Sequence, residues 1–116
     1  MKNIPQWDLY IWRGASFSEK FTFLQSKGGA AEDFSGMTFE AFIRKQPDFN
    51  STKLGAFTIP LPISDGIVYL NLTQAETVAL VGSGGYYDIV VTNGAVITPR
   101  IHGKITFEDV KSYTVT

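Results

Sequence analysis

The stretch LNLTQAETVALVGSGGYYDIVVTNGAV, from Leu70 to Val96, decides the fold of this chain. It combines a strand end, a capped helical segment, a glycine-rich joint and a second strand that leads into an Asn-Gly pair. Each residue in it has a role in folding, and none has the character of a nucleophile, a metal ligand or a phosphate-binding loop. The stretch therefore indicates a β-rich domain and no particular chemistry.

A short helix of two turns is expected over residues 73–81. Thr73 and Glu76 form a capping box, in which the hydroxyl accepts from the backbone N–H of residue 76 and the carboxylate accepts from that of residue 73. The glycine-rich run that starts at Gly82 ends the helix. We expect Leu80 to be the main anchor of this helix in the core. The rest of the apolar surface would consist of Ala75, Val78, Ala79 and Val81.

Two strands joined by a hairpin follow the helix. The first runs from Tyr86 to Thr92, and its inward residues would be Tyr87, Ile89 and Val91. Asn93-Gly94 predicts a type I′ turn, which requires two positive φ angles. Gly103, in the return strand over 95–107, indicates a bulge or the close approach of another backbone. The apolar face of this return strand would carry Ile97, Pro99, Ile101, Ile105 and Phe107.

Five earlier segments also have the alternation of strands, namely 8–12, 17–24, 37–45, 54–59 and 67–72. Pro60 and Pro62 make the fourth an edge strand or a loop, because proline cannot donate to a ladder. Glu19 interrupts the apolar face of its strand, so we expect it near the solvated end. Seven or eight short strands with turn signals between them predict an all-β sandwich.

Composition sets further bounds on the protein. A chain of 116 residues corresponds to one domain, which we place at 8–116 after an N-terminal arm at 1–7. The sequence has no cysteine, so disulfides and thiolate metal sites are excluded. With a net charge of −1 and no basic stripe, nucleic acid is not an expected partner. No apolar run long enough for a membrane span and no signal peptide are seen, so we expect synthesis and folding in a cytoplasm.

The residues that could carry chemistry have simpler interpretations. His102 lies between two cations on the polar face of its strand and is expected to be solvated, with no readable link to a nucleophile or second ligand. Asp88 interrupts its strand and is expected to pair with Arg13 or Arg44 on a neighbouring strand. The run 82–85 follows a helix, which is the wrong order for a phosphate loop. We therefore predict no catalytic, cofactor or metal site.

Two tryptophans near the N-terminus give the only hint of a partner. Trp7 and Trp12 lie close together in sequence, and Trp7 is in an otherwise polar segment that also contains Ile4. One interpretation is that both rings pack on their own domain, given the apolar area each must bury. The other is a docking segment, in which Ile4, Trp7 and Trp12 contact a neighbour or add to the edge of its sheet.

The order of several motifs resembles small structural proteins of tailed bacteriophages. The runs that carry this resemblance are WRGASF at 12–17, DFSGMTFEAFIR at 33–44, GIVYLNLTQAET at 66–77, YYDIVV at 86–91 and GKITF at 103–107. They cover nearly the whole chain, although each is mostly a turn or a set of core positions. Phe34 stands where leucine is usual, and Ala15 where an acid is common. The resemblance implies an immunoglobulin-like antiparallel β-sandwich, similar to the N-terminal domain of baseplate upper proteins.

The same resemblance implies a function without catalysis. The expected role is a virion component at the baseplate, tail-fibre attachment, neck or capsid exterior, made in the host cytoplasm and docked on other virion proteins as a symmetric multimer. The alternative is a carbohydrate-binding or adhesin-like module, in which Tyr69, Tyr86 or Tyr113 would form a platform for a host-surface glycan. An enzyme that depends on His102 is a more distant third hypothesis.

Overall fold

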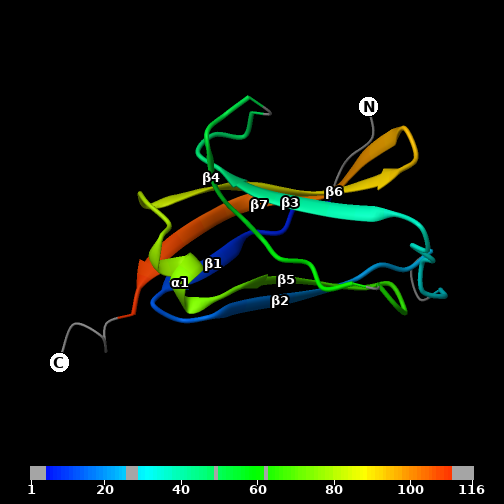
Figure 1. The fold of residues 1–116 in the computed structure, drawn as a ribbon, viewed down its shortest axis with the longest axis horizontal. Helices are drawn as coiled ribbons and strands as arrows, with labels where there is room; N and C mark the ends of the chain where they lie inside the picture. Colours follow the sequence, from blue (N-terminus) through cyan, green and yellow to red (C-terminus); the bar gives the residue numbers. More distant parts are fainter. Residues whose placement is uncertain (1–4, 26–28, 49, 62, 111–116) are drawn as a thin grey trace.

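The chain folds into two facing layers of β-strands with one short helix at an end (Figure 1). The structure is a computed structural model that describes residues 5–25, 29–48, 50–61 and 63–110. Its elements are β1 (Leu9–Arg13), β2 (Phe17–Thr22), β3 (Thr38–Arg44), β4 (Lys53–Ala56), β5 (Ile67–Leu72), α1 (Gln74–Val78), β6 (Gly84–Asn93) and β7 (Val96–Asp109).

The larger sheet has the strand order β1-β7-β6-β3-β4, and the smaller sheet pairs β2 with β5. This arrangement confirms the expected immunoglobulin-like β-sandwich. The ladders are antiparallel except one, because β1 runs parallel to β7 with Leu9 opposite Ile105. The short strand β4 lies at an edge of the larger sheet, as the prolines after it predict.

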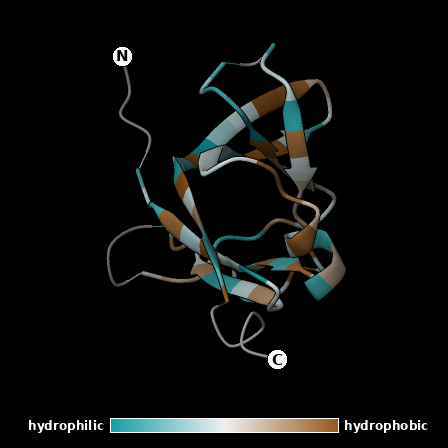
Figure 2. Cartoon of the chain, turned by 90° about the vertical axis from the view of Figure 1, so that its left-hand side faces the viewer, coloured by the Kyte–Doolittle hydropathy of each residue, from teal (hydrophilic) through white to brown (hydrophobic). Residues whose placement is uncertain are grey.

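The core lies between the two sheets and is built by the alternation of each strand. Figure 2 shows hydrophobic residues interleaved with polar ones along the strands of both layers. In β5 the inward residues Val68 and Leu70 are fully buried, and Ile43 and Ile89 face them from the larger sheet. The expected inward residues of β6, namely Tyr87, Ile89 and Val91, are all buried.

The capping box at Thr73 and Glu76 is present, and Leu80 is buried as expected. The helix is shorter than predicted, however, and the prediction of its buried face is wrong. The face with Ala75, Val78 and Ala79 lies in solvent, as does Val81. Thr77 is buried instead. Its hydroxyl accepts from the N–H of Gly14 at 3.2 Å and donates to the carbonyl of Ala15 at 2.9 Å. A polar side chain therefore joins α1 to the β1–β2 turn.

The hairpin after β6 differs from the predicted turn by one residue. Asn93 pairs with Val96, so the two turn residues are Gly94 and Ala95. Only Gly94 has a positive φ, of 62°, which matches a type II′ turn instead of type I′. The paired positive φ angles occur at Asp65 and Gly66, in the tight turn before β5.

The return strand β7 does not keep one apolar face along its length. Ile89 pairs with Ile101 and Val90 with Pro99, which leaves Arg100 as the extra residue of a bulge. The bulge reverses the alternation, so the predicted inward residues Pro99 and Ile97 lie opposite the outward residues Val90 and Thr92 and are exposed. The inward part of the strand is Ile101, Ile105 and Phe107.

Gly103 is the site where another backbone approaches closely. The N–H of Trp7 donates to the carbonyl of His102 at 2.9 Å, and the hydroxyl of Tyr87 donates to the carbonyl of Trp7 at 2.6 Å. A Cβ at residue 103 would collide with that Trp7 carbonyl. The described part of the predicted arm, residues 5–7, is therefore hydrogen-bonded along β7, and the boundary between arm and domain stays a prediction.

Gly103→Ala should lower the free energy of unfolding by about 1–3 kcal/mol, because the Trp7 backbone or β7 must move to admit the methyl group. Urea denaturation measures this change. Gly55→Ala is a suitable control, since its Cβ would meet no backbone but only the ends of two side chains, Leu80 at 3.2 Å and Ile43 at 3.8 Å. Equal losses for the two variants would contradict the close approach at Gly103.

Candidate functional site

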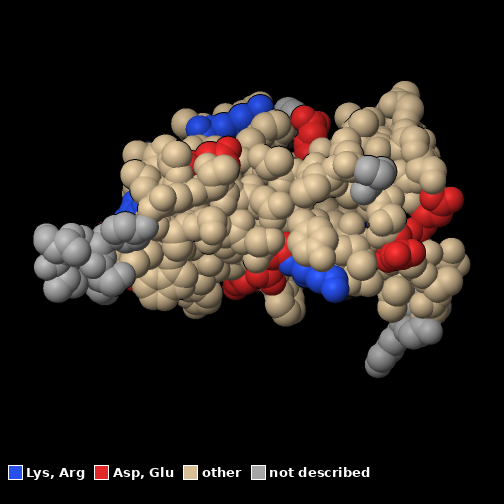
Figure 3. Space-filling model, turned by 60° about the horizontal axis from the view of Figure 1, so that its bottom comes forward, with Lys and Arg blue, Asp and Glu red and all other residues tan. Residues whose placement is uncertain are grey.

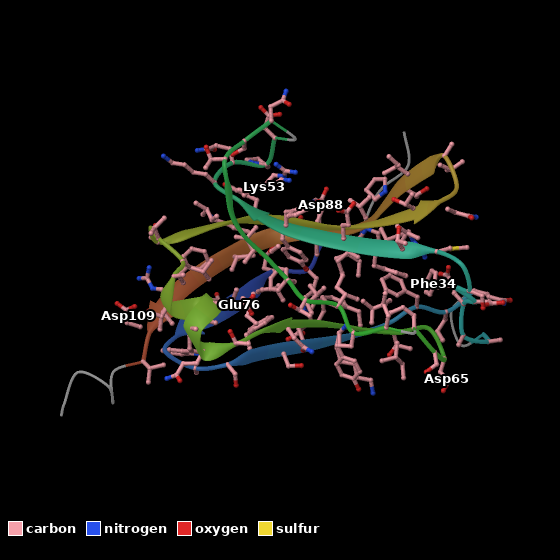
Figure 4. All side chains as sticks on the ribbon, in the orientation of Figure 1. Phe34, Lys53, Asp65, Glu76, Asp88 and Asp109 are labelled. Atoms are coloured by element: carbon pink, nitrogen blue, oxygen red, sulfur yellow. The ribbon has the colours of Figure 1, made fainter. Side chains whose placement is uncertain are left out.

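A groove crosses the outer face of the larger sheet. Its volume is about 400 Å³, and its floor comes from the neighbouring strands β6 and β7. Gln6 forms one wall, and Arg44 with the loop after β3 forms the other. Figure 4 shows Asp88 pointing away from the smaller sheet on this side of the molecule. The side chains that meet in the groove include Gln6, Arg44, Gln46, Asp48, Tyr86, Asp88, His102 and Lys104.

Alternation and register explain why these side chains meet. Because Tyr87 and Ile89 face the core, Tyr86 and Asp88 must face outward. The register then places Tyr86 between Lys104 of β7 and Arg44 of β3. In the next row, Asp88 lies between His102 and Phe42. The floor of the groove therefore consists of two neighbouring rows of side chains, one centred on Tyr86 and one on Asp88, whose positions are set by the pairing register of the strands.

Asp88 does not form the ion pair that its position in the sequence suggests. Arg13 is 2.8 Å from Asp109 at the far end of the sheet, so it does not reach Asp88. No ion pair joins Asp88 to a cation among the residues that the structure describes. Partial burial raises the pKa of Asp88 above its ordinary value of 3.8, and the positive charges of Arg44 and His102 oppose this shift only in part.

His102 lies in the groove as a neighbour of Asp88. Its side chain is exposed, and its backbone bonds to Pro5 and Trp7. Within the described ranges, no group of three or more His, Cys, Asp or Glu side chains could hold a metal ion. The arrangement offers hydrogen-bond donors and acceptors to a ligand. The hypothesis of an enzyme that depends on His102 stays untested.

The two tryptophans of the predicted docking segment lie on different sides of the sandwich edge. The side chain of Trp7 is 54% exposed, and its indole N–H donates to Glu19 of β2 at 3.2 Å. Glu19 lies in mid-strand opposite Leu70, so its predicted place near a strand end is wrong. Trp12 is 50% exposed on the outer face of β1. Ile4 lies outside the described residues.

Tyr10 is a functional candidate that the sequence reading missed. It is 66% exposed and shares the outer face of β1 with Trp12. The alternation of Leu9 and Ile11 as inward residues could have identified it. Gln6 and Gln46 of the groove had no such signal, because only the folded chain brings the N-terminal segment and the loop after β3 to the same sheet face.

The charged side chains are dispersed over the molecule. Figure 3 shows the side of the smaller sheet, where Lys, Arg, Asp and Glu are scattered among uncharged residues. Arg100 lies at the end of the sandwich, where it makes two hydrogen bonds with Glu32 and covers the ring of Phe23 at 5.0 Å. No described helix is both long and apolar enough to span a bilayer.

Asp88→Asn should stabilise the protein at pH 7, because it removes a carboxylate charge that partial burial disfavours. The gain should be less than about 1 kcal/mol, since solvent at this half-open site screens the charge. In the wild type the raised pKa means that the Asp88 carboxyl binds its proton more tightly in the folded state than in the unfolded state. The stabilisation of the folded state by this proton is complete below pH 3.8, and it is lost as the pH rises through the raised pKa of Asp88. The advantage of the variant should therefore vanish at low pH, which thermal unfolding across pH measures.

Asp33→Asn is the matched control with the opposite sign. Ser35 donates to Asp33 from its hydroxyl and its backbone N–H, and both bonds lower the pKa of that carboxyl. This variant should lose stability at neutral pH, and the loss should shrink as the pH falls below the ordinary value of 3.8. If Asp88→Asn behaved in the same way, the interpretation of Asp88 would be wrong.

Comparison with known proteins gives matches of structure only. No family model and no curated protein matches the chain. The extracellular fragment of novel immune-type receptor 11 from Ictalurus punctatus is 11% identical, with a TM-score of 0.46 over 92% of this chain and 100% of that one. The extracellular fragment of novel immune-type receptor 10 from the same organism is 15% identical, with a TM-score of 0.42 over 92% of this chain and 100% of that one.

A DUF4784 family protein from Bacteroides caccae is also similar. It is 12% identical, with a TM-score of 0.44 over 88% of this chain and 22% of that one. These likenesses concern the β-sandwich architecture alone, and they provide no link to phage virion proteins.

Proposed function

We propose that this protein is a non-enzymatic docking module of a tailed-phage virion. The observation that carries the docking role is the exposure of Tyr10 and Trp12, side by side in alternation on the outer face of the edge strand β1. The ordered motifs from Trp12 to Phe107 support the phage setting, through their resemblance to small virion proteins.

The exposure of these rings favours a binding role for physical reasons. Aromatic side chains offer a large apolar area at a low cost in conformational entropy, and they dominate the energy of many interfaces. Here the core is already filled by other residues, so Tyr10 and Trp12 are not required to close it. Because β1 is an edge strand, a partner can reach both the rings and the neighbouring backbone.

Docking on other virion proteins around a symmetry axis would repeat this surface on each copy. The chain would be made in the host cytoplasm and incorporated into the virion during assembly. Trp7 would contribute less than Trp12 in this arrangement, because its indole already contacts Glu19 across the two sheets. The identity of the virion protein that binds β1 would determine where in the virion this chain lies.

Two of the three tyrosines named for the glycan platform lie on opposite outer faces of the sandwich. Tyr69 lies on the outer side of the smaller sheet, opposite Lys20, whereas Tyr86 lies on the outer side of the larger sheet. The two rings therefore cannot contact one flat sugar surface. Tyr113 lies outside the described residues.

Replacement of both rings, as Tyr10→Ser with Trp12→Ser, should remove the chain from assembled particles. The test is quantitative mass spectrometry of phage particles purified from cells that produce a tagged chain. The variant should lose at least about tenfold in incorporation, because hot-spot aromatics each contribute about 2 kcal/mol or more. Its melting temperature should stay close to that of the wild type, since both side chains are exposed.

A control with similar exposed apolar area is available at the tip of the β6–β7 hairpin. Val96 and Ile97 are 64% and 68% exposed, so Val96→Ser with Ile97→Thr removes comparable surface from another place. This control should enter particles normally. Absence of the wild-type chain from particles, or equal incorporation of both variants, would overturn the proposal.

A further inference from the structure

We propose that the groove over β6 and β7 is a binding site for a neutral, hydroxyl-rich ligand such as a saccharide unit. This site is distinct from the aromatic surface on β1, because Tyr10 and Trp12 do not line the groove. It also differs from a flat tyrosine platform, since the groove is hollowed and has two walls.

The charges in the groove balance one another. Arg44 and Lys104 are cationic, whereas Asp48 and Asp88 are anionic. A charged ligand would be attracted by one pair and repelled by the other, so neither an anion nor a cation gains a net Coulomb attraction here. The groove therefore has no charge preference of its own, and a neutral ligand can bind through hydrogen bonds to both pairs.

The hydrogen-bonding groups call for a ligand that both donates and accepts. Asp88 is half-buried and only accepts when ionised, whereas Lys104 only donates. The amides of Gln6 and Gln46 do both, and they stand on opposite walls. Adjacent hydroxyl groups on a sugar ring supply donors and acceptors at short spacing. Bonds to a partly desolvated carboxylate are stronger than bonds to an exposed one.

Size and shape agree with this chemistry. A volume of about 400 Å³ lies in the range of small-molecule sites. The ring of Tyr86 and the apolar ring of Pro47 are part of the lining, and they can cover the C–H faces of a pyranose. The floor strands β6 and β7 share the longest ladder of the sheet, so the site is held by rigid elements.

Two-dimensional NMR of the isotope-labelled chain tests the proposal. The probes are methyl glucoside, methyl galactoside, methyl mannoside and N-acetylglucosamine, each titrated to tens of millimolar. At least one should shift the backbone amides of Tyr86, Asp88 and Lys104 in a saturable manner. Asp88→Ala should weaken that binding about tenfold or more, because it removes a charged acceptor.

Glu40→Ala is the matched control, since Glu40 is an exposed acid of β3 that does not line the groove. It should leave the affinity unchanged, and the same spectra report whether each variant is folded. The proposal is overturned if no neutral sugar gives saturable shifts in the groove, or if only inorganic phosphate or methylammonium does. It is equally overturned if Asp88→Ala binds as well as the wild type. None of these results depends on Tyr10 or Trp12, so the docking role is tested separately.

Discussion

Apolar packing between the inner faces of the two sheets is the interaction on which the rest of the structure depends. The sequence has no cysteine, so no disulfide can join the layers, unlike the inter-sheet bridge typical of antibody domains. Ile43 and Ile89 of the larger sheet and Val68 and Leu70 of the smaller sheet are fully buried. At roughly 2 kcal/mol for each such side chain, this contact is the main opposition to chain entropy.

The N-terminal segment depends on a second constraint, the absence of a side chain at Gly103. This glycine lets the backbone of Trp7 lie against β7, where the buried hydroxyl of Tyr87 holds its carbonyl. Burial raises the pKa of that hydroxyl, so it remains a donor at all ordinary pH values. The same attachment places Gln6 at the wall of the groove and starts β1 as an edge strand.

The outer face of the larger sheet therefore carries two separate surfaces. The aromatic pair on β1 is suited to a protein partner, because it presents apolar area at an edge. The groove over β6 and β7 presents balanced charges and amides around Asp88, which suits a small neutral ligand. In β1 and β6 the outward residues of the two surfaces alternate with inward residues that fill the core. Packing of the core therefore fixes the outward orientation of Tyr10, Trp12, Tyr86 and Asp88.

The sequence by itself determined the fold class, most strands and the capping box at Thr73, because alternation and capping are local properties of the chain. Tertiary structure decided that Thr77 is buried in place of Val78, since a hydrogen bond to the β1–β2 turn outweighs local hydrophobicity. It also decided the bulge at Arg100, the parallel pairing of β1 and the groove around Asp88. The pairing of β1 and the walls of the groove depend on segments far apart in the sequence, and the bulge is a register shift within the β6–β7 hairpin, so alternation alone encodes none of them.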